Sequence, residues 1–112
     1  LKNFSLIENM PGSRIFQLSK AYDMLPVNVI MPEDKEQMAL TINGKKRNIH
    51  KKEFRKLAES YEISPKAAEN MLKKICRMEN KLLDQVEGAY LSKEQKEQVS
   101  QLVHERIKTL SL

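Results

Sequence analysis

Hydrophobic and polar positions follow two different patterns along this chain of 112 residues. Short β-prone runs occupy residues 4–7 and 15–18, and the segment between them contains Pro11-Gly12, a strong turn signal. We therefore expect a β-hairpin near the N-terminus. Because a two-stranded ribbon is only marginally stable by itself, this hairpin needs another surface to pack on.

The next segment, residues 20–35, has no regular pattern, and Pro26 and Pro32 interrupt it. We expect irregular structure there. Residues 38–42 read Met-Ala-Leu-Thr-Ile, and the turn pair Asn43-Gly44 follows them. This combination predicts one more short strand that ends in a tight turn.

From residue 51 onward, apolar residues recur in steps of three and four, which is typical of amphipathic helices. We predict one helix over 51–61 and a long helix from Pro65 to about residue 89, with Ser64 as its N-cap. A capping box at Ser92 begins the last helix. Its apolar face comprises Val99, Leu102, Val103, Ile107 and Leu110.

The two final helices are expected to pack antiparallel, because the link at residues 89–91 is short. The predicted fold class is therefore mainly α, with a small β-hairpin at the N-terminus. With 40% hydrophobic and 31% charged residues, the composition is ordinary for a globular domain, and the length suits a single one.

The composition also predicts where in the cell the protein is located. No apolar run approaches the roughly 20 residues that a membrane-spanning helix needs, so we expect no membrane partner. No signal peptide is visible, and one cysteine, Cys76, cannot form an internal disulfide. We expect a cytoplasmic protein in which Cys76 is a core or boundary residue rather than a nucleophile. The chain begins at Leu1 without an initiator Met, and we expect it to be a fragment of a larger protein.

The net charge of +5 is unevenly distributed, since residues 44–81 carry twelve basic and five acidic side chains. Such a cluster can attract phosphates or an acidic partner, but it is equally well explained as a solvated face. The candidate nucleic-acid contacts are Lys45, Lys46, Arg47, Lys51 and Lys52.

One pair of residues is a candidate metal-binding site. Asn3 stands just before the predicted hairpin and Asp23 just after it, and a hairpin returns the chain to its starting point. The amide and carboxylate oxygens of such a pair are suitable ligands for Mg²⁺. Protein kinases use this order of a catalytic-loop Asn, a short ribbon and a metal-binding Asp, although the spacing alone is a loose signal.

The residues around this pair narrow the interpretation. The segments 1–7 (LKNFSLI), 18–26 (LSKAYDMLP) and 38–45 (MALTINGK) closely resemble motifs in the C-terminal half of HipA-family serine/threonine kinases, the toxins of bacterial toxin–antitoxin pairs. The resemblance implies that Asn3 and Asp23 bind Mg²⁺ beside ATP and that Lys2 contributes to cofactor binding. It also implies a catalytic Asp upstream of Leu1, so no catalytic residue is expected in this chain.

Under this resemblance, 1–112 is a single fragment domain with a hairpin and metal-loop segment at 1–43 and a helical lobe at 44–112. Mg²⁺ and ATP would be cofactors of the intact parent, and we expect neither them nor kinase activity in the fragment. The implied partners are the upstream kinase lobe, a HipB-like antitoxin and operator DNA through that complex. A fragment dimer is also conceivable.

An alternative function rests on residues 54–75. Their start, FRKLAESYEISPKAA, resembles a helix-turn-helix signature, so the segment and the basic cluster could form a DNA-binding or antitoxin-binding module. The exposed face of its second helix would carry Lys66, Asn70 and Lys73. Two features favour a generic αα-corner instead: Glu62 stands where a turn glycine is usual, and the second helix is predicted to be long.

Overall fold

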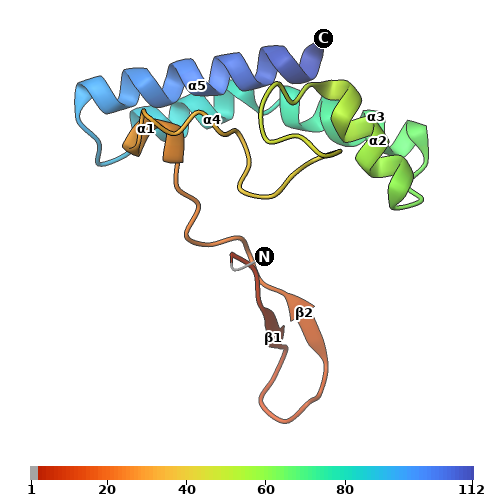
Figure 1. The fold of residues 1–112 in the computed structure, drawn as a ribbon. Helices are drawn as coiled ribbons and strands as arrows, with labels where there is room; N and C mark the ends of the chain where they lie inside the picture. Colours follow the sequence, from red (N-terminus) through yellow and green to blue (C-terminus); the bar gives the residue numbers. More distant parts are fainter. Residues whose placement is uncertain (1–2) are drawn as a thin grey trace.

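The computed structural model describes residues 3–112. Figure 1 shows a β-hairpin that projects from a helical lobe, and the lobe is arranged along its long C-terminal helix. The elements in chain order are β1 (Leu6–Glu8), β2 (Phe16–Leu18), α1 (Val27–Ile30), α2 (Lys51–Ser60), α3 (Pro65–Cys76), α4 (Glu79–Glu87) and α5 (Lys93–Ser111). The predicted class, mainly α with a small N-terminal hairpin, is confirmed.

The hairpin is antiparallel, with Leu6 opposite Leu18. Its turn is held by the carboxylate of Glu8, which accepts hydrogen bonds from the backbone N–H groups of Gly12 at 3.0 Å and Arg14 at 2.7 Å. Gly12 has a φ of +80°, a conformation that glycine adopts without a steric penalty. The turn predicted from Pro11-Gly12 is therefore present.

The faces of the hairpin are apolar but uncovered. Leu6, Phe16 and Leu18 keep 60–70% of their surface exposed. Backbone hydrogen bonds and the turn hold the ribbon together, and strands β1 and β2 lie apart from the helices of the lobe (Figure 1). An apolar surface of this kind usually marks a contact with another part of a protein or with a partner.

The strand predicted at residues 38–42 is wrong. The tight turn at Asn43-Gly44 is present, with φ of +51° and +73° at its two central residues, but only one isolated bridge joins Ile42 to Lys45 across it. Within the described part of the chain, no second strand lies beside residues 38–41, so they have no hydrogen-bonding partner along their length. The irregular segment before them also contains the short helix α1.

The single long helix predicted from Pro65 to about residue 89 is also wrong, because it is divided into α3 and α4. At Arg77 and Met78 the ψ angles rise to −14° and −1°, and the N–H of Met78 bonds to the carbonyl of Ile75, three residues back. Both halves pack against α5, so the apolar spacing continues across the break and does not reveal it. The predicted N-cap is confirmed, since Ser64 Oγ accepts a hydrogen bond from the N–H of Ala67 at 3.3 Å.

Helix α5 organises the lobe by contacting α1, α2, α3 and α4, and it runs antiparallel to α4 as predicted (Figure 1). The capping box at its start is confirmed: Ser92 and Gln95 exchange two hydrogen bonds of 3.2 Å. On its inner face Ile107 is buried, together with Ala68 from α3 and Ile49 from the preceding loop. Cys76 is half-buried, with Ser111 Oγ 3.6 Å from its sulfur atom.

A strained residue joins α2 to α3. The N–H of Glu62 bonds to the carbonyl of Glu59 at 3.0 Å, and that of Ile63 bonds to the carbonyl of Ala58 at 2.9 Å. These two bonds form a Schellman motif, in which the residue at the position of Glu62 is usually glycine. Glu62 instead adopts a left-handed φ of +56°.

We therefore expect Glu62→Gly to stabilise the chain by about 1 kcal/mol, because it removes the steric penalty of a β-carbon in the left-handed region. The greater conformational entropy of glycine in the unfolded chain offsets only a small part of this gain. Urea unfolding followed by circular dichroism measures this difference. Glu59→Gly is the matched control, because the same change within helix α2 should destabilise by up to about 1 kcal/mol. If both variants were destabilised alike, the strain at Glu62 would not be real.

Candidate metal centre

The hairpin brings Asn3 and Asp23 together. The side-chain N–H of Asn3 donates to the backbone carbonyl of Asp23 at 3.3 Å, and the N–H of Tyr22 donates to the backbone carbonyl of Asn3 at 3.1 Å. The residues before and after the ribbon are therefore in direct contact, although they are twenty positions apart in sequence. Lys2, the third residue expected to contribute to cofactor binding, lies outside the described residues.

Hydroxyl groups reinforce the base of the hairpin next to this pair. Ser5 Oγ and the Tyr22 hydroxyl are 2.6 Å apart, and Ser19 Oγ accepts a hydrogen bond from the N–H of Ser5 at 2.9 Å. The backbone also pairs here, with the N–H of Ser19 donating to the carbonyl of Ser5 at 2.7 Å. The separation of Asn3 from Asp23 is thus set by several bonds across the ribbon.

The conformation of Asp23 is unusual, because its φ is +54°. Aspartate and asparagine tolerate this left-handed region better than most residues, but the conformation still costs free energy and often occurs at functional sites. In the part of the chain that the structure describes, the exposed carboxylate of Asp23 makes no ion pair or hydrogen bond. Within residues 3–112, its oxygens are therefore without a bonding partner.

These two side chains fit a magnesium site but do not complete one. The amide nitrogen of Asn3 is directed at the backbone carbonyl of Asp23 and at Met24 Sδ, 3.5 Å away, and no described residue bonds to the amide oxygen. Among residues 3–112, no group of three or more His, Cys, Asp or Glu side chains is placed to hold a metal. Mg²⁺ commonly takes one or two protein ligands and completes its octahedron with water and phosphate oxygens, so the pair suits that chemistry.

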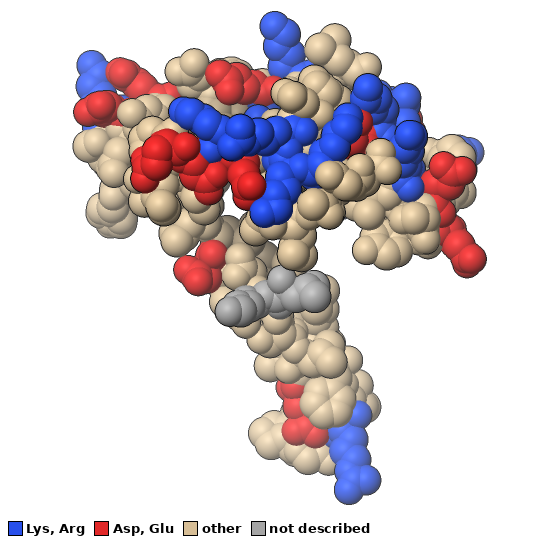
Figure 2. Space-filling model, in the orientation of Figure 1, with Lys and Arg blue, Asp and Glu red and all other residues tan. Residues whose placement is uncertain are grey.

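The predicted basic cluster is partly neutralised within the chain. Lys45 pairs with Glu53 at 2.8 Å, Lys46 with Glu36 at 3.0 Å, and Lys51 with Glu69 at 2.7 Å. The other two candidates for nucleic-acid contact, Arg47 and Lys52, are exposed and make no ion pair with the described residues. Figure 2 shows Lys and Arg side chains gathered across one face of the helical lobe, beside a group of acidic ones.

Two of these three carboxylates, Glu53 and Glu69, lie inside the basic stretch itself. Glu53 is buried, with 2% of its surface exposed, and a hydrogen bond from Lys45 followed by one from the His50 backbone lowers its pKa from 4.5 to about 2. Hydrogen bonds from Lys51 and Arg55 lower the pKa of Glu69 to about 2 as well. Sequence reasoning missed this role, since neither glutamate stands at a spacing that identifies its partner.

The structure weakens one objection to the alternative function, namely that the second helix of the segment 54–75 is too long for a helix-turn-helix. Helix α3 ends at Cys76 after twelve residues, rather than continuing to about residue 89. Lys66, Asn70 and Lys73 are exposed on it, as expected. Glu62 supplies the left-handed turn conformation that a glycine usually provides. The corner therefore has the lengths of a helix-turn-helix, although its basic flank is partly paired.

Within the described range, none of the helices has the length and apolar character required to cross a bilayer.

A search of the curated proteins finds no match for the chain. A family model described as the HipA-like C-terminal domain matches residues 1–82, which include the hairpin, Asn3, Asp23 and the α2–α3 corner. This match covers more than half of the chain, and the chain therefore belongs to the HipA-like C-terminal domain family.

Proposed function

We propose that this chain is the C-terminal part of a HipA-like serine/threonine protein kinase and supplies Mg²⁺-binding and ATP-binding residues to its active site. The observation that carries the proposal is the contact of Asn3 with Asp23 across the hairpin, in a member of the HipA-like family. A kinase needs this juxtaposition because the two residues hold metal ions against the phosphates of ATP.

Each residue has a defined part. The carboxylate of Asp23 and the amide oxygen of Asn3 would hold the metal, and Lys2 would flank the catalytic loop and contribute to cofactor binding. When bound, Mg²⁺ would supply neutralisation of the negative charge on the phosphates during transfer. The bonds at the hairpin base hold the backbone that carries the Asp23 side chain, and this would lower the cost of ordering the site.

The remaining parts of the active site are proposed to come from an upstream kinase lobe of the same protein. Phosphoryl transfer also needs a base and groups that clamp the phosphates, and Asn3 and Asp23 supply neither function. The exposed apolar faces of β1 and β2 would pack against that lobe. A cytoplasmic location and a HipB-like antitoxin partner complete the proposal.

The test is phosphoryl transfer by the full-length protein that contains these residues. With γ-labelled ATP and Mg²⁺, we expect label on serine or threonine of the protein itself or of a casein acceptor, and EDTA should abolish it. The chain of 112 residues alone should transfer nothing at the same concentration. Labelling that persists in EDTA, or labelling by the short chain, would contradict the proposal.

A second candidate is the DNA-binding or antitoxin-binding module. The observation in its favour is the length of α3, whose exposed Lys66 and Lys73 could reach a phosphate backbone. Against it, three of the five basic residues at 45–52 already bind carboxylates of the same chain, which lowers their attraction for phosphates. The kinase function accounts for more of the chain, and a contact with DNA through a complex is compatible with it.

A further inference from the structure

A short segment tethers Asp23 to the helix that follows it. Only three residues separate Asp23 from α1. Helix α1 has four residues, none of them buried, and helices this short are not stable without tertiary contacts. Whatever holds α1 in place therefore also limits where Asp23 can lie.

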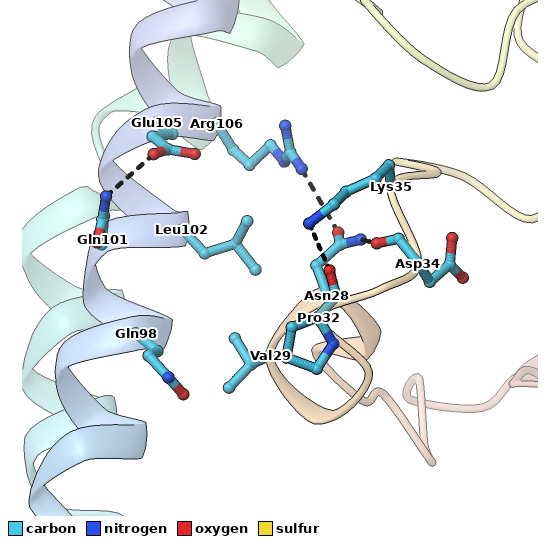
Figure 3. A pocket seen from close by; sticks show the side chains of 10 residues that line it. All are labelled: Asn28, Val29, Pro32, Asp34, Lys35, Gln98, Gln101, Leu102, Glu105 and Arg106. Carbon is cyan, nitrogen blue, oxygen red and sulfur yellow. Dashed lines mark hydrogen bonds between the residues drawn. The ribbon is translucent and has the colours of Figure 1, made fainter.

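Asn28 is the residue through which α1 is held. Its side-chain N–H groups donate to the backbone carbonyls of Asp34 at 2.8 Å and Glu36 at 3.0 Å, which folds the following loop back onto the helix. Its side-chain oxygen accepts a hydrogen bond from Arg106 Nη2 on α5 at 3.5 Å. One amide thus joins α1, the loop after it and the C-terminal helix, as Figure 3 shows.

Other contacts between α1 and α5 are sparse. A groove of about 420 Å³ separates them, with Val29 and Leu102 facing one another across it (Figure 3). Apolar packing at this point is therefore incomplete, and among the described residues the bond between Arg106 and Asn28 is the direct polar connection between the two helices. Nearby charges do not compete for it, because Lys35 Nζ donates to the carbonyl of Pro32 and Glu105 accepts from Gln101.

We propose that Arg106, acting through Asn28, positions Asp23 for metal binding. Arg106 is a positioning residue, since it lies on α5 and bonds to Asn28 rather than to Asn3 or Asp23. It also lies beyond residues 1–82, the part of the chain that the family model matches. The proposal rests on the proposed function of Asp23 and adds that the C-terminal helix sets the affinity of the site for Mg²⁺.

The experiment uses the full-length protein with Arg106→Ala, Arg106→Lys and Asn28→Ala, and Lys108→Ala as the control on an exposed position of the same helix. Calorimetric titration with Mg²⁺ and a non-hydrolysable ATP analogue measures binding without turnover. We expect Arg106→Ala and Asn28→Ala to weaken Mg²⁺ binding about 10-fold, in the range typical of residues that orient metal ligands. Arg106→Lys should retain part of the affinity, and Lys108→Ala all of it.

Hydrogen exchange provides a second readout on the metal-free protein. Amides of residues 27–31 should exchange faster in Arg106→Ala and Asn28→Ala, while those of α4 should be unchanged. A purely structural role would lower the fraction of folded protein but leave the Mg²⁺ affinity and the local exchange of the folded molecules as in wild type, and that result would overturn the inference. If the wild type itself bound no Mg²⁺–nucleotide, the proposed function would fail first.

Discussion

Replacing Asp23 by asparagine in the full-length protein is expected to reduce phosphoryl transfer from ATP by at least about 100-fold. The carboxylate is the charged member of the Asn3–Asp23 pair, and it is free of other partners among the described residues. Asparagine has similar size and tolerates the φ of +54° at least as well, so the backbone should not change. The substitution thus removes the negative charge at the proposed metal site and little else.

Initial rates over a series of Mg²⁺ concentrations measure this effect. A lost ligand should raise the Mg²⁺ concentration needed for half-maximal rate as well as lower the maximal rate. Asp84→Asn is the matched control, since it makes the same chemical change at an exposed position on α4 and should leave the rate unaltered. Wild-type activity in Asp23→Asn would remove Asp23 from the site and with it the main support for the proposed function.

Replacing Glu53 by glutamine should give the largest loss of stability of any single carboxylate in the chain. Its carboxylate accepts bonds from Lys45 Nζ and the His50 N–H, both at 2.8 Å, and it is buried where the loop at 42–49 meets α2. Without the charge, Lys45 loses its partner, and a buried amide must satisfy bonds that the carboxylate satisfies now. We expect Tm to fall by roughly 5 °C or more.

The same residue predicts how stability depends on pH. The folded-state pKa of Glu53 is about 2, below its ordinary value of 4.5, so the folded chain releases the proton more readily than the unfolded chain. The stabilisation is therefore complete above about pH 4.5 and is lost as the pH falls toward 2. Glu69, whose pKa is also about 2, adds to the same decline.

Thermal unfolding of wild type and Glu53→Gln between pH 2 and pH 7 checks both statements. The difference in Tm between the two proteins should be greatest at neutral pH and should shrink below about pH 4.5. Glu97→Gln, at an exposed position on α5, serves as the control and should follow the wild-type curve. A difference in Tm that does not vary with pH would show that the charge of Glu53 is not what stabilises the fold.

The sequence by itself determined the features that depend on local chemistry. Pro11-Gly12 and Asn43-Gly44 specified turns, and Ser64 and Ser92 specified helix starts, because each acts through bonds within a few residues. The apolar spacing identified the inner face of α5, on which Ile107 is buried and the other predicted residues are half-buried. The contact between Asn3 and Asp23 also followed from the sequence, since a hairpin necessarily returns the chain to its starting point.

Only the tertiary structure decided the features that depend on distant partners. Residues 38–42 have strand-like composition but find no neighbouring strand in the described chain, so they remain irregular. The helix predicted after Pro65 breaks at Arg77, where both halves still pack on α5 and keep one apolar spacing. The pairing of lysines with Glu53 and Glu69, and the bond from Arg106 to Asn28, join residues from 8 to 78 positions apart. Local pattern carries no information about such contacts, because packing of the whole lobe brings them together.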